Sequence, residues 1–217
     1  MEQAPEAQGG TNEELNVGGE LPGTDEARRE IEGPRIYVAS LSDYNAGILH
    51  GRWIDASPQP EEIEADIAEM LADSPTTKRY GEVAEEWAIH DYEGFGLADV
   101  DEYDSVRRIS RLAQGIANYG EAFSAWWAQE TRDDNDGGDV FSQFEQQYHG
   151  SFETMDDYGR DFLADLGFDV DDLRGEIPES LAPYVRFDLD AWLRDLSAGG
   201  DVNTIEGRNC VYVFWPE

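Results

Sequence analysis

Acidic residues outnumber basic ones by 49 to 15 in this chain of 217 residues, which gives a net charge of −34 at neutral pH. Any fold must therefore hold a large excess of carboxylates at its surface, because unpaired charges are not buried. The apolar share of 40% and the aromatic share of 12% still suffice for a packed core, so the chain is expected to fold. A surface this negative repels phosphate and anionic lipid, which excludes direct binding to nucleic acid or membranes.

The basic residues are unusual too, because Lys78 is the single lysine beside fourteen arginines. A salt-adapted host produces acidic, lysine-poor surfaces, and a GC-rich genome favours arginine over lysine. Both explanations compete with a functional role for the acidity, and composition alone leaves them open.

The first 33 residues carry no periodic apolar pattern and have a net charge of −7, which predicts a disordered acidic tail at 1–33. One cysteine, Cys210, excludes an intramolecular disulfide and suits a reducing compartment. The sequence shows neither a signal peptide nor an apolar run of membrane-spanning length. A cytoplasmic location is therefore expected.

Strand and helix patterns alternate over residues 34–95. Strands are predicted at 35–41, 48–54 and 86–91, with turn chemistry at 43–47. A helix of about a dozen residues is predicted after Pro60, since apolar residues recur there at helical spacing. Its expected buried face consists of Ile63, Ile67, Met70 and Leu71. This order predicts a ββαβ-type N-terminal α/β domain at 34–95.

The period becomes helical from about residue 97 and predicts a central helical domain at 96–150. The remaining residues, 151–217, predict a mixed α/β domain. Its expected elements are a helix at 152–166, a helix around Trp192 and a final strand at 211–215. The fold class is accordingly α+β.

The stretch AIHDYEGF at residues 88–95 resembles an active site in composition only. Catalysis would need a nucleophile with a base in reach, and no G-x-S-x-G elbow accompanies His90. Cys210 is expected in an apolar strand, where a thiol is inert. Strand alternation also points His90 away from Ile89 and Asp91. A structural role is favoured, and a hydrolytic enzyme using His90 and Asp91 is the alternative.

Neither metal nor cofactor binding is predicted. The histidines, His50, His90 and His149, are far apart and form no i, i+4 pair. The loop at 133–139 resembles a calcium loop in composition, but a glycine falls at the fifth ligand position in either alignment. No lysine and serine or threonine follow Gly94-Phe95-Gly96, so a phosphate-binding loop is absent as well.

The acids are spread along the chain, with 11 at 34–90, 13 at 91–150 and 16 at 151–217. Glu153, Asp157, Asp161 and Asp165 recur at i, i+4 spacing, where each like-charge pair costs about 0.2–0.5 kcal/mol. Without the tail the net charge is −27, which equals that of about 46 Å of duplex DNA at one charge per roughly 1.7 Å. An elongated body with this charge could imitate a DNA segment.

Three stretches of the sequence carry a family resemblance. Residues 35–56, RIYVASLSDYNAGILHGRWIDA, and residues 86–95, EWAIHDYEGF, resemble the signatures of the ArdA antirestriction proteins, and 211–214, VYVF, resembles their last strand. The similarity extends over roughly 34–217, while the tail and the segment at 133–139 depart from the compact pattern. In this light AIHDYEGF is a fold signature: Ile89 packs on the sheet, Gly94 turns the chain into the helical domain, and Trp53 lies in the core.

The resemblance implies a protein encoded by a mobile element that mimics DNA and occupies the DNA groove of type I restriction–modification enzymes, on their methyltransferase and specificity subunits. It implies an elongated, curved homodimer of three small domains per chain, with no catalytic activity and no cofactor. An acidic interaction module of a halophile remains the other alternative. The residues expected to form the phosphate-mimicking surface are Asp91, Glu93, Asp99, Asp101, Glu102, Asp104, Asp133, Asp134, Asp136, Glu153, Asp157, Asp161 and Asp165.

Overall fold

The computed structural model contains helices and two small antiparallel sheets, which confirms the predicted α+β class. The predicted tail lies outside the described residues, apart from Gly33. The structure describes residues 33–129, 139–171 and 178–216.

The first sheet has the strand order β2-β1-β3, with both pairings antiparallel. Its strands are β1 (Arg35–Ser40), β2 (Gly51–Asp55) and β3 (Trp87–Glu93), and these confirm the three predicted strands within a few residues. The sheet places apolar side chains on both faces, because Ile36 and Val38 belong to the main core while Tyr37 packs edge-on against Trp53 on the other side. Trp53 is 5% exposed, as predicted.

Helix α3 (Pro60–Ala72) follows β2 and covers one face of this sheet. Pro60 occupies its first turn, where the missing N–H costs no hydrogen bond. The four apolar side chains predicted for its inner face are all buried, and the acidic residues between them point to solvent. Periodicity therefore placed this helix correctly.

Two short helices were not predicted from the sequence, and one of them lies where a turn was expected. Helix α2 (Leu41–Asn45) replaces the turn expected at 43–47, because Ser40 caps it by accepting from the Asp43 N–H. Helix α4 (Pro75–Tyr80) was not predicted and begins at the N-cap Ser74. The two helices contact each other, and the Asp43 carboxylate accepts from the Thr76 N–H at 2.8 Å. This long-range hydrogen bond stabilises helices that are too short to form alone.

A bulge in β3 breaks the alternation that the sequence analysis assumed around His90. Tyr37 pairs with Asp91 and Val38 pairs with Ile89, which leaves His90 as the extra residue. Asp91 consequently lies on the Tyr37 face of the sheet and not on the face of Ile89, where strict alternation would place it. Ile89 is 5% exposed and packs in the core, as predicted.

The central helices are α5 (Val106–Tyr119), α6 (Glu121–Gln129) and α7 (Val140–Gln147). Residues 97–105 precede them without regular structure, so the helical segment starts later than predicted. At Gly115 the ring of Phe123 comes so close that an added Cβ would lie 2.1 Å from it. Gly115 thus allows α5 and α6 to pack tightly.

The second sheet has the order β4-β6-β5 and joins β4 (Tyr148–Phe152), β5 (Asn203–Glu206) and β6 (Val211–Phe214). Only β6 was predicted. Phe152 belongs to β4 and not to the helix predicted at 152–166. Cys210 lies just before β6 and not within it.

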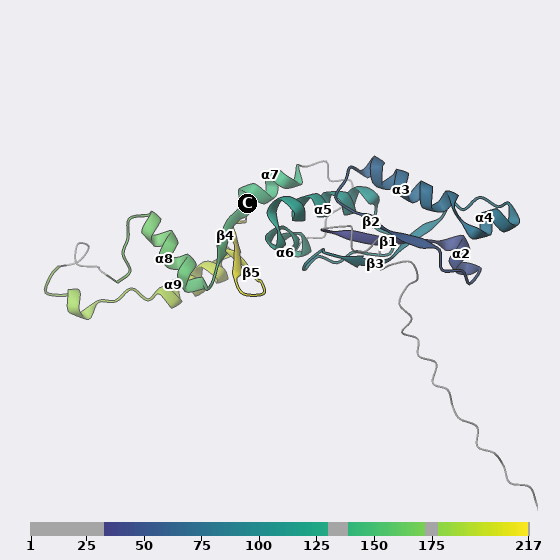
Figure 1. Ribbon diagram of the computed structural model, residues 1–217. Coiled ribbons are helices and arrows are strands. Elements are labelled where there is room, and N and C mark those ends of the chain that lie inside the picture. The colour runs from purple at the N-terminus through teal and green to yellow at the C-terminus, as the bar shows by residue number, and fades with distance from the viewer. Residues whose placement is uncertain (1–32, 130–138, 172–177, 217) are drawn as a thin grey trace, which may run out of the picture.

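Helices α8 (Met155–Asp165) and α9 (Leu189–Gly199) contact each other beside this sheet. Their buried residues Tyr158, Leu163, Leu189 and Leu193 form a cluster with Val213. A separate, larger cluster joins the first sheet to α3, α5, α6 and α7, and includes Phe214 from β6. Figure 1 shows the described elements in an extended row from α4 and α2 at one end to α8 and α9 at the other. The division at 95/96 and 150/151 stays a prediction.

Candidate acidic interface

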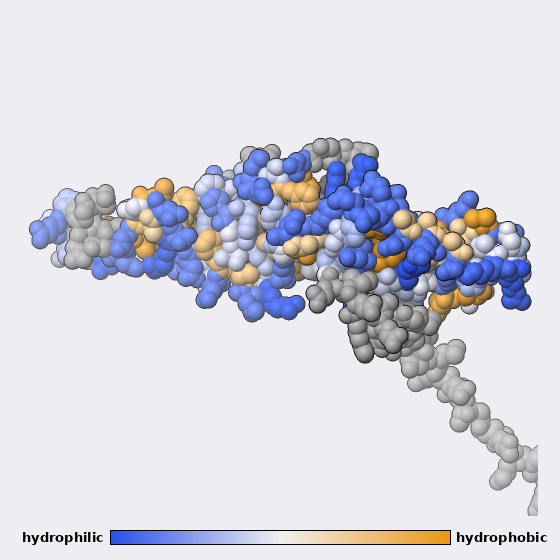
Figure 2. Space-filling view, turned by 45° about the horizontal axis from the view of Figure 1, so that its top comes forward, coloured by the Kyte–Doolittle hydropathy of each residue, from blue (hydrophilic) through white to orange (hydrophobic). Residues whose placement is uncertain are grey.

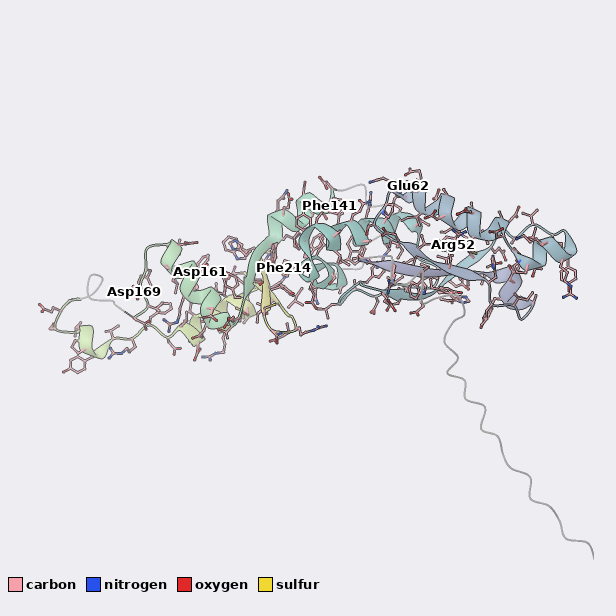
Figure 3. All side chains as sticks on the ribbon, viewed as in Figure 1. Arg52, Glu62, Phe141, Asp161, Asp169 and Phe214 are labelled. Carbon is pink, nitrogen blue, oxygen red and sulfur yellow. The ribbon has the colours of Figure 1, made fainter. Side chains whose placement is uncertain are left out.

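The outer face of α3 carries the densest group of exposed carboxylates along a single described helix. The apolar positions of α3 face the sheet, so the remaining positions must face solvent. Figure 3 shows Glu62 on the outer side of this helix. The exposed acidic residues of this face are Glu61, Glu62, Glu64, Asp66 and Glu69.

The spacing of these carboxylates approaches that of duplex DNA. From Glu61 to Glu69 the helix rises about 12 Å at 1.5 Å per residue. Duplex DNA of that length carries about seven phosphates at one per roughly 1.7 Å, and α3 offers five carboxylates. Glu69 is the one among them that pairs with a base, through Arg52 at 2.8 Å. None of these five residues was among the predicted site residues, although the apolar periodicity of α3 already indicated an exposed acidic face.

The segment between β3 and α5 holds a second acidic group. Asp99, Asp101 and Glu102 are exposed there, as expected for an interface. Asp104 differs, because it accepts a hydrogen bond from the Asp101 N–H at 2.9 Å and pairs with Arg108 at 2.7 Å. Its side chain is 11% exposed, so Asp104 serves mainly to hold this segment against α5.

Asp91 and Glu93, the two predicted site residues of β3, are less exposed to a binding partner than expected. Glu93 accepts hydrogen bonds from the Arg35 guanidinium, including one from Nε at 3.0 Å. Asp91 is half-buried and accepts from the Tyr92 N–H at 2.8 Å. Gly94 follows with φ +83°, and its backbone lies against Gly33 and Pro34, so an added Cβ would lie 2.9 Å from the Gly33 carbonyl oxygen. The chain turns here, as predicted.

Helix α8 carries the third group of exposed carboxylates. It contains three of the four residues that the i, i+4 spacing predicted. Glu153 precedes the helix, and Thr154 is the N-cap that accepts from the Asp157 N–H at 3.2 Å. The i, i+4 row within the helix therefore contains only Asp157, Asp161 and Asp165, all exposed. Figure 3 shows Asp161 on α8, far along the molecule from Glu62 on α3. Asp133, Asp134 and Asp136 lie outside the described residues.

Three carboxylates outside these acidic groups have lowered pKa values. A hydrogen bond from Lys78 lowers the pKa of Asp73, and a hydrogen bond with Ser142 lowers the pKa of Asp139. Burial would raise the pKa of Asp43, but hydrogen bonds from Thr76, Ser40 and Ser74 outweigh it and lower this pKa to about 2. Figure 2 shows hydrophilic residues over most of the visible face, interrupted by smaller apolar areas.

The side chain of His90 contacts an aromatic ring. The imidazole packs edge-on against the Tyr44 ring, with 4.9 Å between ring centroids. Within the described ranges, no group of three or more His, Cys, Asp or Glu residues could hold a metal ion. His50 is occupied elsewhere, since its Nε2 lies 2.8 Å from the Met70 carbonyl oxygen. Among the helices that the structure describes, none is long and apolar enough to cross a membrane.

Fold and surface together define an acidic α+β protein whose exposed carboxylates are distributed over several elements. The family model described as "Antirestriction protein (ArdA)" matches residues 36–209, which is most of the chain. The chain belongs to the ArdA family of antirestriction proteins, whose members inhibit restriction enzymes. A search of curated proteins found no match.

Proposed function

We propose that this protein mimics DNA and competes for the DNA-binding groove of a type I restriction–modification enzyme, on its methyltransferase and specificity subunits. The observation that carries the proposal is the outer face of α3, where carboxylates stand at nearly the linear density of phosphates in a duplex. Membership of the antirestriction family supports a restriction enzyme as the partner.

The mechanism is electrostatic occlusion. Carboxylates take the place of phosphates and meet the lysine and arginine side chains that line a DNA groove, which releases the counterions held there. Exposed charge pairs are screened within about 8 Å at physiological ionic strength, so binding weakens as salt is added. The enzyme can then no longer engage incoming DNA, and no reaction on the inhibitor's part is needed.

The acidic groups of α3, of the segment at 99–102 and of α8 act additively in this proposal. They lie on different elements spread along an extended molecule, as Figure 1 shows, so one enzyme groove would meet several groups at once. Each exposed ion pair contributes only about 0.2–1 kcal/mol. No single carboxylate therefore dominates. Asp133, Asp134 and Asp136 remain proposed members of this surface.

We also propose that the protein acts in the cytoplasm as a homodimer. Each chain would consist of three domains, at 34–95, 96–150 and 151–217. Exposed apolar side chains in the last third of the chain support self-association there, since large apolar groups at a surface favour burial. They include Leu166, Leu181 and Tyr184, which are 69%, 51% and 83% exposed. Trp215 is 36% exposed, and its Nε1–H donates a hydrogen bond to the Tyr158 hydroxyl of the same chain at 3.1 Å.

The experiment that tests the proposal neutralises the α3 face as a block. Changing four carboxylates to amides removes roughly 1–4 kcal/mol of binding at 0.2–1 kcal/mol each, which is at least about fivefold in affinity. The readout is the concentration that half-displaces labelled target DNA from a type I enzyme. The block consists of Glu61→Gln, Glu62→Gln, Glu64→Gln and Asp66→Asn.

The chain supplies a matched control on the same helix. Glu69→Gln removes a carboxylate that already pairs with Arg52, so it is expected to change displacement by less than about twofold. Unchanged displacement by the folded block variant would contradict the role of α3. Wild-type protein that unfolds below molar salt would instead favour the halophile interpretation of the acidity.

A further inference from the structure

The first sheet has a second face on the side away from the main core. Because Ile36 belongs to the main core, alternation along β1 places Arg35 and Tyr37 on the other side. The residues paired with these two on β2 and β3 share that side. We call it the outer sheet face, and it consists of Asp55, Arg35 and Glu93 in one row and Trp53, Tyr37 and Asp91 in the next.

Two large aromatic side chains of the outer sheet face are almost completely buried. Trp53 is 5% exposed and Tyr37 is 3% exposed. Among the described residues, Ala39 is the one further apolar member of their cluster. Helices α3 and α5 pack on the opposite side of the sheet, as Figure 1 shows. A solvated face of an antiparallel sheet would leave side chains of this size more exposed. The outer sheet face therefore needs a cover, and the apolar residues that the structure describes do not provide it.

The polar groups of the outer sheet face suit an arginine in that cover. The Arg35 guanidinium lies 5.4 Å from the centroid of the Trp53 ring and pairs with Glu93, and each of these three residues takes part in a further interaction within the chain. Asp91 is half-buried and accepts from a backbone N–H, and a carboxylate in that position is stabilised by a cation. Trp53 and Asp91 flank Tyr37 about 10 Å apart, so a guanidinium between them can reach both.

The chain before β1 can supply this arginine. Arg28 and Arg29 are the only bases among the first 33 residues. Gly33, where the described residues begin, has φ +107°, a conformation that favours glycine and allows the chain to reverse. Arg29 and Tyr37 are both four residues from Gly33. A segment that folds back at Gly33 therefore brings the two level, about 14 Å from the turn.

We propose that residues 25–32 fold back at Gly33 and lie extended across the outer sheet face, with Arg29 between the Trp53 ring and the Asp91 carboxylate. In an extended segment Ile31 faces the sheet together with Arg29, while Arg28 faces solvent. The outer sheet face is thus the docking site of the chain's own N-terminal segment. This inference concerns a contact within one chain, so it does not depend on the proposed function.

A second copy of the chain fits the outer sheet face less well. A segment that is tethered beside its site is present at an effective concentration in the millimolar range. A second copy would bring a net charge of −34 against the carboxylates of Asp91 and Glu93. The same charge excludes nucleic acid and anionic lipid as the cover.

Hydroxyl-radical footprinting of the full-length protein tests this contact, because the oxidation rate of a side chain follows its exposure. Trp53 is expected to be protected in wild type, and Tyr44, which is 53% exposed, is the exposed standard after correction for intrinsic reactivity. Arg29→Glu is expected to raise the oxidation rate of Trp53 about three- to thirtyfold, since it removes an exposed ion pair and a cation–π contact. Arg28→Glu is the matched control. It makes the same charge change on the solvent side and is expected to alter the rate by less than about twofold.

A second variant tests the apolar part of the cover. Ile31→Ser is expected to raise the oxidation rate of Trp53 about fivefold, because it removes a partly buried apolar side chain. Met70, which is 1% exposed in the main core, stays protected in each variant if the fold is intact. Equal effects of Arg28→Glu and Arg29→Glu, or a Trp53 that is oxidised in wild type as fast as Tyr44, would overturn the proposal. Protection of Trp53 that is lost on dilution would overturn it as well and would assign the cover to a second copy.

Discussion

Replacing Asp161 and Asp165 on α8 by asparagine is expected to stabilise the protein. The change removes the like-charge pairs Asp157–Asp161 and Asp161–Asp165, each unfavourable by about 0.2–0.5 kcal/mol. Asp165 is also the last residue of the helix, where the partial negative charge of the helix end opposes a carboxylate by about 0.3–1 kcal/mol. Together these terms raise the free energy of unfolding by about 0.7–2 kcal/mol.

The assay is urea unfolding followed by far-ultraviolet circular dichroism at low and high salt. The gain is expected to shrink at 0.5 M salt, because the repulsion that it removes is screened. Asp156→Asn is the matched control on the same helix. Asp156 lies in the first turn, where a carboxylate is favourable, so this variant is expected to lose about 0.3–1 kcal/mol.

The same pair of variants links stability to function. If α8 belongs to the enzyme-binding surface, the double variant is more stable and yet a slightly weaker inhibitor. A variant that is less stable than wild type, or a control that changes in the same direction, would refute the claim that these carboxylates are kept at a cost to the helix.

The remaining predictions concern the interior and the histidine. Asp43→Asn is expected to cost about 2 kcal/mol at pH 7, since the carboxylate pKa falls from 3.8 unfolded to about 2 folded. That contribution is present above pH 3.8 and is lost as the pH falls through about 2, so wild type and variant are expected to converge in acid-unfolding curves. Gly115→Ala would force a Cβ into the Phe123 ring, and a loss of about 1–3 kcal/mol in urea unfolding is expected. His90→Ala is expected to keep inhibition within about twofold of wild type, whereas a hydrolytic enzyme would lose its activity.

Local periodicity predicted the long helices of this fold. The elements that it did not predict depend on long-range contacts. Helix α3 was predictable because its buried residues repeat at helical spacing. Helix α2 has turn-like composition and forms because Asp43 bonds to Thr76, 33 positions away. Strand β4 is short and contains Gly150 with φ +135°, and it exists through its pairing with β6. Such pairings leave no local pattern in the sequence.

In the candidate interface, too, local spacing could be predicted from the sequence and long-range pairing could not. The exposed face of α3 was already implied by the apolar spacing of that helix. The ion pair between Asp104 and Arg108 follows i, i+4 spacing and could have been found as well. The ion pair between Glu93 and Arg35 could not be predicted, because the two residues are 58 positions apart and meet only through the register of β1 and β3.

The most direct test of DNA mimicry is a competition titration with wild-type protein. Increasing amounts are added to a type I restriction–modification enzyme bound to labelled target DNA, at low and at physiological salt. The account predicts displacement near stoichiometric amounts at low salt and weaker displacement at physiological salt. Folded protein that leaves the DNA bound at low salt would contradict it.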